Sequence, residues 1–465
     1  MKKAIGILLF TCILITSLIL PSAAQKKAAP TNEFVPVLRF IAASDTHIQD
    51  DNNIHAERVQ KMLAYTYREA RADKNHPTLD ALLLCGDVTH DGTKTEFEKM
   101  KQTLDSAVKP ETRILAVAAM AHDGYDMKRA EVRDAITMPT GNEADFHVVI
   151  GGYHFIGISV SDSFPLHYVD AQRTWLKEQL DAATAQNPQQ PVFVMQHEHI
   201  YKTVYGSFPD ERWGLAYFKE VLEQYPQVVD FSGHSHYPLN HPNSVWQGAF
   251  TAVGTGAIKS TDFTVEDLRD IAQSPDNAKC STFWIVEIDS ANRMRLRGID
   301  LLAEKVLCEY ILENPANPAN REMSDENKAA KSTAPVFAKG AAIKVKTAKG
   351  GCTVTVPAAA STDGFPIVLY RAFAKDASGK VITKTWTMPA YYLSDEQPEI
   401  TLNLRGLGKG DYTVSVVAET AYGVQSAPLE KNITIDSPGQ VSAFFARIYY
   451  WCEHAAAVVV KQIGI

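Results

Sequence analysis

Five short segments rich in aspartate and histidine each follow an apolar run that is predicted to be a buried strand. In open α/β sheets, ligand sites lie beyond the carboxyl ends of the strands, so these polar side chains are expected to meet around one cleft. A single such segment arises by chance in many proteins, whereas five in this arrangement constrain the fold strongly. The segments are DTH (Asp45, His47), GDVTHDG (Asp87), AHD (His122, Asp123), QHEH (His197) and GHSH (His234, His236).

Apolar strands alternate with amphipathic helices along the first part of the chain. The predicted strands include 38–44, 79–87 and 113–120, and helical patterns cover 56–72 and 94–106 between them. The second helix is opened by the capping-box pattern of a threonine followed three residues later by a glutamate. This β-α-β-α order predicts an α/β layered core.

The character of the sequence changes after the first domain. Residues 313–334 are rich in Asn, Ala, Pro, Lys and Glu and are interpreted as a linker. Residues 335–436 contain short alternating strands with turn signals, which predict an all-β sandwich. The strand from Tyr412 to Ala418 resembles the YxVxVxA strand of fibronectin type III domains. The apolar tail, 437–465, is either a helix packed on the body or a helix that contacts a membrane surface.

The N-terminus has the layout of a secretory signal peptide. Two lysines precede an apolar run from Ala4 to Leu20, and small residues follow, so cleavage is expected after Ala24 and the signal covers 1–24. An uncleaved membrane anchor is the alternative, because the apolar run is long for a signal. Both interpretations predict export to the periplasm, the cell surface or the medium of a bacterium.

Charge and cysteine content narrow the function classes. The net charge is -8 with no strong Lys/Arg cluster, which argues against binding to a nucleic-acid duplex. The six cysteines contain no CxxC pair, so a zinc ribbon is not expected. Cys280 and Cys308 are candidates for a disulfide in an oxidising compartment, although sequence alone does not establish the pairing.

The residue types in the five segments point to metal chemistry. Imidazole and carboxylate together suit Zn, Fe or Mn. So many ligands require two metals, and a pair of cations can clamp the attacking and leaving oxygens of a phosphoryl transfer. One carboxylate must then bridge the cations, and Asp87 is the most central candidate.

The order DxH, GD, GNH[DE], H, GHxH resembles that of the calcineurin-like metallophosphoesterases over 37–312. HEHIYKTVYGS and VVDFSGHSHYPL look like exported bacterial members, some of which resemble class III cyclic-nucleotide phosphodiesterases. The resemblance implies a four-layer α-β-β-α sandwich and two divalent metal ions. It also implies that His122 meets the substrate phosphate and protonates the leaving oxygen. Asp123 either orients that histidine or is exposed to solvent. The implied ligands of one metal are Asp45, His47, Asp87 and His236, and those of the second are Asp87, His197 and His234.

The chain departs from this family pattern in one segment. The family has Gly-Asn before the histidine, whereas this chain has Met120-Ala121. The Asn normally ligates the second metal and Ala121 has no donor atom, so the second site is expected to be weak. His199 stands where related sequences have a proline and is interpreted as a polar loop residue, with a ligand or substrate contact as the alternative. For His90, substrate contact and a solvated turn both remain open.

The resulting prediction is an exported, metal-dependent phosphoesterase. Metal-activated hydroxide would attack a phosphomonoester or phosphodiester of a small molecule or nucleotide, with His122 as general acid. Two alternatives stay open. The first is a catalytically impaired member that binds metal or a phosphorylated ligand, because of Met120-Ala121. The second is a cell-surface binding protein that acts through the β-sandwich. The sequence favours no oligomeric state.

Overall fold

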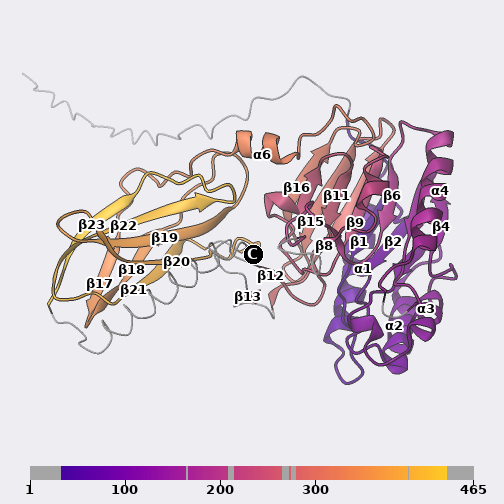
Figure 1. The fold of residues 1–465 in the computed structure, drawn as a ribbon, viewed down its shortest axis with the longest axis horizontal. Helices are drawn as coiled ribbons and strands as arrows, with labels where there is room; N and C mark the ends of the chain where they lie inside the picture. The colour runs from indigo at the N-terminus through magenta and orange to yellow at the C-terminus, as the bar shows by residue number, and fades with distance from the viewer. Residues whose placement is uncertain are drawn as a thin grey trace, which may run out of the picture.

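The structure is a computed structural model in which two parts follow one another along the chain (Figure 1). An α/β part, indigo to pink in Figure 1, precedes a strand-rich part in orange and yellow. The predicted signal peptide and the apolar tail lie outside the described residues. The described residues are 33–163, 166–207, 214–263, 272–273, 279–395 and 397–436.

Two six-stranded mixed sheets form the centre of the α/β part. In each sheet a parallel block carries the predicted motifs, and antiparallel strands extend the block. The first sheet runs β16 (Lys305–Leu312), β15 (Met294–Asp300), β14 (Thr282–Asp289), β1 (Pro36–Ala43), β2 (Ala81–Cys85), β3 (Arg113–Val117). The second runs β10 (Val245–Gln247), β11 (Thr251–Gly254), β9 (Val228–Ser232), β6 (Val192–Met195), β5 (Tyr153–Gly157), β4 (Phe146–Ile150).

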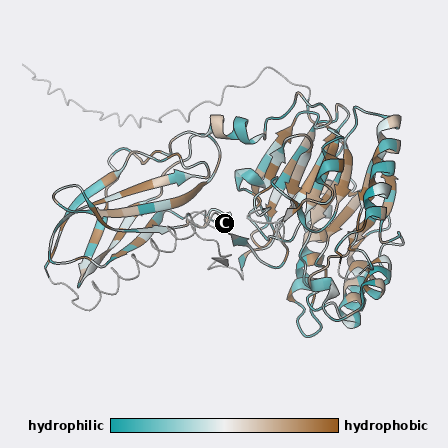
Figure 2. Ribbon diagram, viewed as in Figure 1, coloured by the Kyte–Doolittle hydropathy of each residue, from teal (hydrophilic) through white to brown (hydrophobic). Residues whose placement is uncertain are grey.

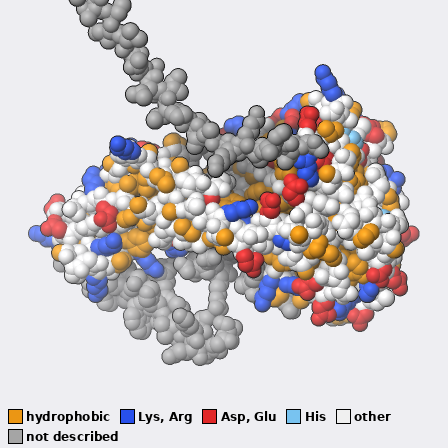
Figure 3. Space-filling model, turned by 90° about the horizontal axis from the view of Figure 1, so that it is seen from above, with side chains coloured by type: hydrophobic (Ala, Val, Ile, Leu, Met, Phe, Trp, Pro, Cys, Tyr) orange, Lys and Arg blue, Asp and Glu red, His pale blue; other side chains and the backbone are white. Residues whose placement is uncertain are grey.

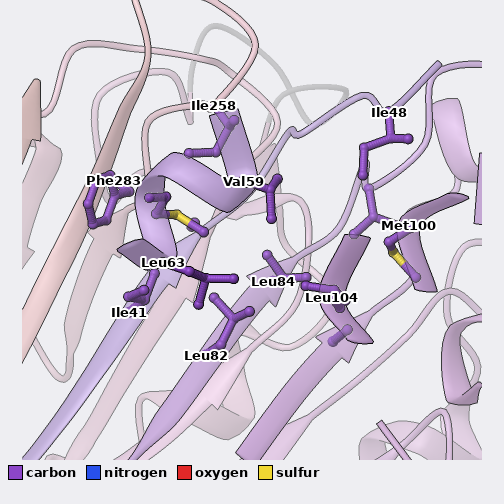
Figure 4. Packing of buried hydrophobic residues seen from close by; sticks show 14 of the residues in the cluster. Ile41, Ile48, Val59, Leu63, Leu82, Leu84, Met100, Leu104, Ile258 and Phe283 are labelled. Atoms are coloured by element: carbon purple, nitrogen blue, oxygen red, sulfur yellow. The ribbon is translucent and has the colours of Figure 1, made fainter. Parts of the chain in front are cut away.

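Three hydrophobic clusters hold these layers together. Between the two sheets, the Phe40 ring lies 4.9 Å from the Phe193 ring and 5.7 Å from the Phe231 ring, centroid to centroid. A second cluster joins the first sheet to helices α1 (Ile54–Ala72), α2 (Lys94–Ala107) and α3 (Arg129–Thr137) (Figure 4). A third joins the other sheet to α4 (Asp170–Gln186) and α5 (Lys219–Leu222). The layers are therefore helix, sheet, sheet and helix.

The local sequence signals explain where the first helices begin and which side they bury. The capping box predicted at the start of α2 is confirmed, because the Thr93 hydroxyl accepts from the Glu96 backbone N–H and the Glu96 carboxylate accepts in return. Val59, Leu63 and Met100 point into the cluster shown in Figure 4. Brown strands inside and teal helix surfaces in Figure 2 show the same segregation over the whole α/β part.

The C-terminal part consists of two antiparallel sheets that share one hydrophobic cluster. Side chains from both sheets enter this cluster, including Val354, Leu402, Tyr370 and Val414. One sheet contains β17 (Lys344–Ala348), β18 (Gly351–Pro357) and β21 (Glu399–Arg405). The other contains β20 (Val381–Thr387), β19 (Ile367–Lys375), β22 (Gly410–Thr420) and β23 (Leu429–Ile435).

Helix α6 (Asp325–Lys331) lies within the range predicted to be a linker and packs against the α/β part. The Lys328 ammonium is fully buried and donates to the backbone oxygens of Pro242 (3.3 Å) and Val245 (3.0 Å). The strand-rich part also contacts the α/β part directly, since the Asn240 amide donates to the Tyr391 backbone oxygen at 2.6 Å. These contacts join the two parts.

The structure settles two further points about the described residues. Cys280 and Cys308 do not form a disulfide, so the pairing that the sequence left open is absent. Within these ranges, no helix has the length and apolar character needed to cross a membrane. On the face shown in Figure 3, acidic and basic side chains are interspersed.

Asp230 on β9 is a buried carboxylic acid that predicts a pH dependence of stability. Its side chain has no exposure, and burial raises its pKa to about 7. Because the folded-state pKa lies above the unfolded one, ionisation of Asp230 removes stability as the pH rises toward and through 7. Asp230→Asn should therefore gain about 2–3 kcal/mol relative to the wild type between pH 5 and pH 8. Chemical denaturation at both pH values measures this difference.

The control is Asp134→Asn, which changes an exposed aspartate on α3. Its stability difference from the wild type should be the same at pH 5 and pH 8. A flat profile for Asp230→Asn as well would mean that Asp230 is ionised in the folded protein throughout this range.

Candidate metal centre

The five motif segments meet at one edge of the α/β part. Strands β1, β2 and β3 are parallel neighbours in one sheet, and β6 and β9 are parallel neighbours in the other. Their carboxyl ends therefore point the same way within each sheet, and the residues that follow them converge. The structure brings together all eight residues that the sequence singled out.

The first metal-binding group consists of Asp45, His47 and His236. The Nε2 atom of His236 lies 3.1 Å from Asp45 Oδ1 and 3.3 Å from His47 Nε2. All three side chains are buried. Two imidazoles and a carboxylate with converging donor atoms are a ligand set suited to Zn, Fe or Mn.

The second group consists of Asp87, His197 and His234. Asp87 Oδ2 lies 3.2 Å from His197 Nε2, and it also lies 4.0 Å from His47 Nε2 in the first group. Asp87 is therefore the carboxylate between the two groups, as the resemblance implied. Apart from this Asp87 contact, the buried His197 Nε2 atom has no polar partner within the described residues, so it could bind a cation together with Asp87.

Neighbouring backbone groups orient the ligand side chains. The Nδ1–H of His197 donates to the Cys85 backbone oxygen at 2.9 Å, which leaves Nε2 as the atom with a lone pair. The His234 backbone N–H donates to Asp45 Oδ2 at 3.1 Å. This second contact ties the two groups to each other through the protein itself.

The backbone at the site is strained in a way that non-glycine residues rarely adopt. Positive φ angles occur at 51° for Asp45, 49° for Asp87 and 74° for His234. His47 and His236 share this conformation, at 45° and 57°. Left-handed backbone costs free energy and persists where a site requires it, so its concentration at the proposed ligands supports a functional role.

Two glycines in the motifs are required by close packing. A Cβ atom on Gly86 would lie 2.6 Å from His197 Nδ1, and one on Gly233 would lie 2.5 Å from Asp45 Oδ2. Both distances are too short for real contacts. The GD and GH pairs in the sequence therefore have a steric cause at this centre.

The charges of the centre shift its pKa values in opposite directions. Burial alone would raise the pKa of Asp45, but the charges of His236 and His197 and the hydrogen bonds from His236 and Ser44 together hold it well below its usual range. Burial alone would lower the pKa of His197, but Asp87 raises it well above the ordinary value. In both pairs the carboxylate and the imidazole stabilise each other's charge, and a cation would take over that role from the imidazole proton.

His122 lies beside the two groups on the short helix η1 (His122–Gly124). Its backbone N–H donates to Asp87 Oδ1 at 3.2 Å, and its Nδ1–H donates to the His90 backbone oxygen at 2.7 Å. The ring lies 4.2 Å from that of His47. With Nδ1 occupied, Nε2 is the nitrogen left to meet a substrate.

Asp123 is buried and anchors the turn that carries His122. Its Oδ1 atom accepts from the Thr89 backbone N–H (2.9 Å) and hydroxyl (2.8 Å), and its Oδ2 atom accepts from the Ala119 N–H at 2.9 Å. Solvent exposure, the alternative left open by the sequence, is wrong because the side chain has no exposure. Asp123 is thus a positioning residue. Burial, together with the charge of Asp87, raises its pKa to about 7.

The departure at Met120-Ala121 is accommodated without opening the turn. The half-buried Met120 side chain packs against the cluster beneath the first sheet. The Ala121 backbone oxygen accepts from the Gly124 N–H at 2.9 Å. Ala121 directly precedes the backbone N–H that binds Asp87, and its methyl group offers no donor atom.

Two further histidines, His199 and His90, lie near the centre, and the sequence suggested a solvated loop or turn for each of them. His199 is not a solvated loop residue, because it is buried and its ring nitrogens lie 2.9 Å from the Ser232 hydroxyl and 2.7 Å from the Ser235 hydroxyl. Both nitrogens are therefore occupied, which rules out the ligand alternative in this arrangement. His90 lies within reach of His47 and His122, and its buried Nδ1 atom has no hydrogen-bond partner within the described ranges.

Lys259 is a residue of this centre that the sequence reasoning missed. Its backbone N–H donates to the Asp45 backbone oxygen at 3.0 Å. Burial lowers the pKa of its ammonium group, and the charges of Asp45, Asp262 and Asp87 oppose that shift. The available signal was a lysine directly after the apolar run AFTAVGTGAI (249–258), since the other site residues also lie at or just beyond the ends of apolar runs.

The part of the chain that carries most of the centre also matches a known protein family. Residues 38–238 match the family model of the calcineurin-like phosphoesterases. This range contains the Asp/His groups that could hold metal ions, and the match supports a phosphoester hydrolase. The match ends before β11, β14, β15 and β16, which nevertheless complete the same two sheets. A sequence comparison with curated proteins found no significant match.

Solved structures offer only distant likenesses. GAP50, the anchor in the inner membrane complex of Plasmodium, is 14% identical over 60% of this chain and 89% of its own, with a TM-score of 0.41. Purple acid phosphatase PPD1 from yellow lupin (Lupinus luteus) seeds is 10% identical over 59% of this chain and 53% of its own, with a TM-score of 0.42. At such scores these likenesses add nothing to the family match.

Proposed function

We propose that this protein is an exported, metal-dependent phosphoesterase that hydrolyses a phosphomonoester or phosphodiester of a small molecule or nucleotide. One observation carries the proposal: two Asp/His groups share Asp87, and His122 lies beside them with one ring nitrogen available. Export rests on the N-terminal signal pattern in 1–24. HEHIYKTVYGS and VVDFSGHSHYPL look like exported bacterial members of the family, some of which resemble class III cyclic-nucleotide phosphodiesterases, and this resemblance supports a nucleotide substrate.

Each residue of the centre has its own role in this proposal. Asp45, His47, Asp87 and His236 would hold one divalent cation, and Asp87, His197 and His234 the other. Such cations lower the pKa of water and neutralise charge that develops on phosphoryl oxygens. His122 would protonate the leaving oxygen from Nε2–H, while the carbonyl of His90 accepts from Nδ1–H and orients the ring. Asp123 holds the turn, and Lys259 adds a positive charge that attracts the phosphate.

The C-terminal sheets are proposed to form a fibronectin type III-like sandwich that supports the catalytic part. The single hydrophobic cluster shared by both sheets supports this proposal. So does the alternation along β22, where Val414, Val416 and Ala418 belong to this cluster and the intervening Ser415 and Val417 do not.

Hydrolysis of bis-p-nitrophenyl phosphate and p-nitrophenyl phosphate by the mature chain in excess Mn²⁺ tests the proposed function. Turnover that disappears in an Asp87→Ala protein would establish the metal centre as its source, and the ratio of diester to monoester hydrolysis would begin to define the substrate. A folded wild-type protein with no more turnover than this blank would refute the enzymatic proposal.

A catalytically impaired binding protein is the second candidate, and Ala121 is the observation that favours it. Ala121→Asn should raise the affinity for the second cation by at least about tenfold, because it returns an oxygen donor next to Asp87. Calorimetric titration of the metal-free protein with Mn²⁺ measures this change, and turnover at limiting Mn²⁺ should rise with it.

Ala121→Leu is the matched control, since leucine has the size of asparagine without its donor. If neither Ala121→Asn nor Ala121→Leu changes turnover or the affinity for the second Mn²⁺ ion, another group already compensates for the missing ligand. A gain in Mn²⁺ affinity without any turnover would instead favour the binding protein.

A further inference from the structure

Tyr125 stands out among the apolar and aromatic side chains near the centre. It is 63% exposed, the largest exposure of any large hydrophobic side chain among the described residues. Its ring centroid lies 4.9 Å from that of His122, with the two planes tilted by 52°. The ring therefore leaves most of its surface to solvent and contacts the histidine proposed to protonate the leaving oxygen.

The turn that carries Tyr125 is rigidly held. Tyr125 is the residue that ends η1, and the three hydrogen bonds of the buried Asp123 fix that turn to Thr89 and Ala119. Gly92 packs closely against the backbone of the same turn. The position of the ring beside His122 is thus set by the fold and costs little entropy to maintain for a ligand.

We propose that Tyr125 is a specificity residue that stacks on the aromatic or other planar ring of the leaving group, such as a phenol or the base of a nucleoside. This inference rests on the proposed function, because the group that receives the proton from His122 is the leaving group and must lie next to it. Aromatic side chains bind planar rings through their faces with little dependence on substituents. Tyr125 then selects the leaving group, whereas the Asp/His centre and Lys259 bind the phosphoryl group.

The test compares phenyl phosphate with cyclohexyl phosphate in the Mn²⁺-loaded full chain. Tyr125→Ala should raise KM for phenyl phosphate roughly threefold to tenfold with little change in kcat, since stacking is lost while the chemistry is intact. The same variant should change KM for cyclohexyl phosphate by less than about twofold. Tyr125→Phe, which keeps the ring, should restore the wild-type KM for phenyl phosphate.

A binding measurement separates this inference from the proposed function. Phenylphosphonate and cyclohexylphosphonate cannot be hydrolysed, and their affinities are measured by calorimetry on the same proteins. A preference for phenylphosphonate that Tyr125→Ala removes supports the stacking role, even if no substrate is turned over and the enzymatic proposal fails. Val149→Ala, at an exposed position on β4 away from the turn, is the control and should leave the preference intact.

Two results would overturn the inference. One is an equal rise in KM for both phosphates, or an equal loss of affinity for both phosphonates, in Tyr125→Ala. Such a result would indicate a general effect on the turn. The other is an unchanged preference for the phenyl compounds in Tyr125→Ala, or the absence of binding of either phosphonate to the wild-type protein. Normal turnover of phenyl phosphate alongside either result would leave the proposed function standing.

Discussion

Asp87→Asn should lower kcat/KM for phosphoester hydrolysis by at least about 1,000-fold, because a metal pair held at the proposed sites would supply several kcal/mol of transition-state stabilisation and each 1.36 kcal/mol is a factor of ten. Asp87 Oδ2 lies between His197 Nε2 and His47 Nε2, and Oδ1 accepts from the His122 N–H. Asparagine keeps the size of the side chain but removes its charge. The variant therefore weakens both cation sites and the link to the general acid together.

Metal content and fold must be measured with the kinetics. Elemental analysis should show that Asp87→Asn retains fewer Mn²⁺ ions per chain than the wild type, while its circular dichroism spectrum is unchanged. Asp91→Asn is the matched control, since it makes the same chemical change on an exposed residue of the same loop. Wild-type turnover in Asp87→Asn would show that the chemistry occurs elsewhere.

Glu287→Ala should reduce the free energy of unfolding by about 3–5 kcal/mol, the usual effect of removing one partner from a buried ion pair. The Glu287 carboxylate has no exposure and binds Arg39 Nε through Oε1 at 2.7 Å and Arg295 Nε through Oε2 at 2.7 Å. Arg297 Nε lies 3.4 Å from the same Oε2 atom. Without the carboxylate on β14, Arg39 on β1 and Arg295 and Arg297 on β15 lose the partner that they share.

The pH dependence of this effect has a defined sign. Burial would raise the pKa of Glu287, but Arg297, Arg295 and Arg39 together lower it. A lowered folded-state pKa contributes stability above the unfolded pKa, and that stability is lost as the pH falls through the folded value. The difference between wild type and variant should therefore be full at pH 7 and shrink in acid.

Denaturation in urea, followed by circular dichroism, measures both effects. The control is Glu304→Ala, which removes a surface carboxylate that contacts Arg68 at 2.8 Å and should cost at most about 1 kcal/mol. Equal losses for the two variants would mean that the buried arginines find other partners when Glu287 is absent.

The sequence by itself determined the layered α/β core and located the Asp and His segments that meet at the centre. Asp45, Asp87 and His234 could be located because each follows an apolar strand, and parallel strands of one sheet end at the same edge. The glycines before Asp87 and His234 were part of the same signal, since only a residue without a side chain fits there. Strand periodicity and motif spacing are local properties, so they can be read from neighbouring residues.

Only the tertiary structure decided what surrounds those residues. Asp123 is buried against Thr89, and both ring nitrogens of His199 are hydrogen-bonded to the hydroxyls of Ser232 and Ser235. The nearness of Lys259 to Asp45 likewise joins distant parts of the chain. The exposure of Tyr125 beside His122 follows from the anchored turn. Burial, charge and contact arise between segments that are far apart in sequence, so no local pattern records them, and they become definite only when the two sheets pack.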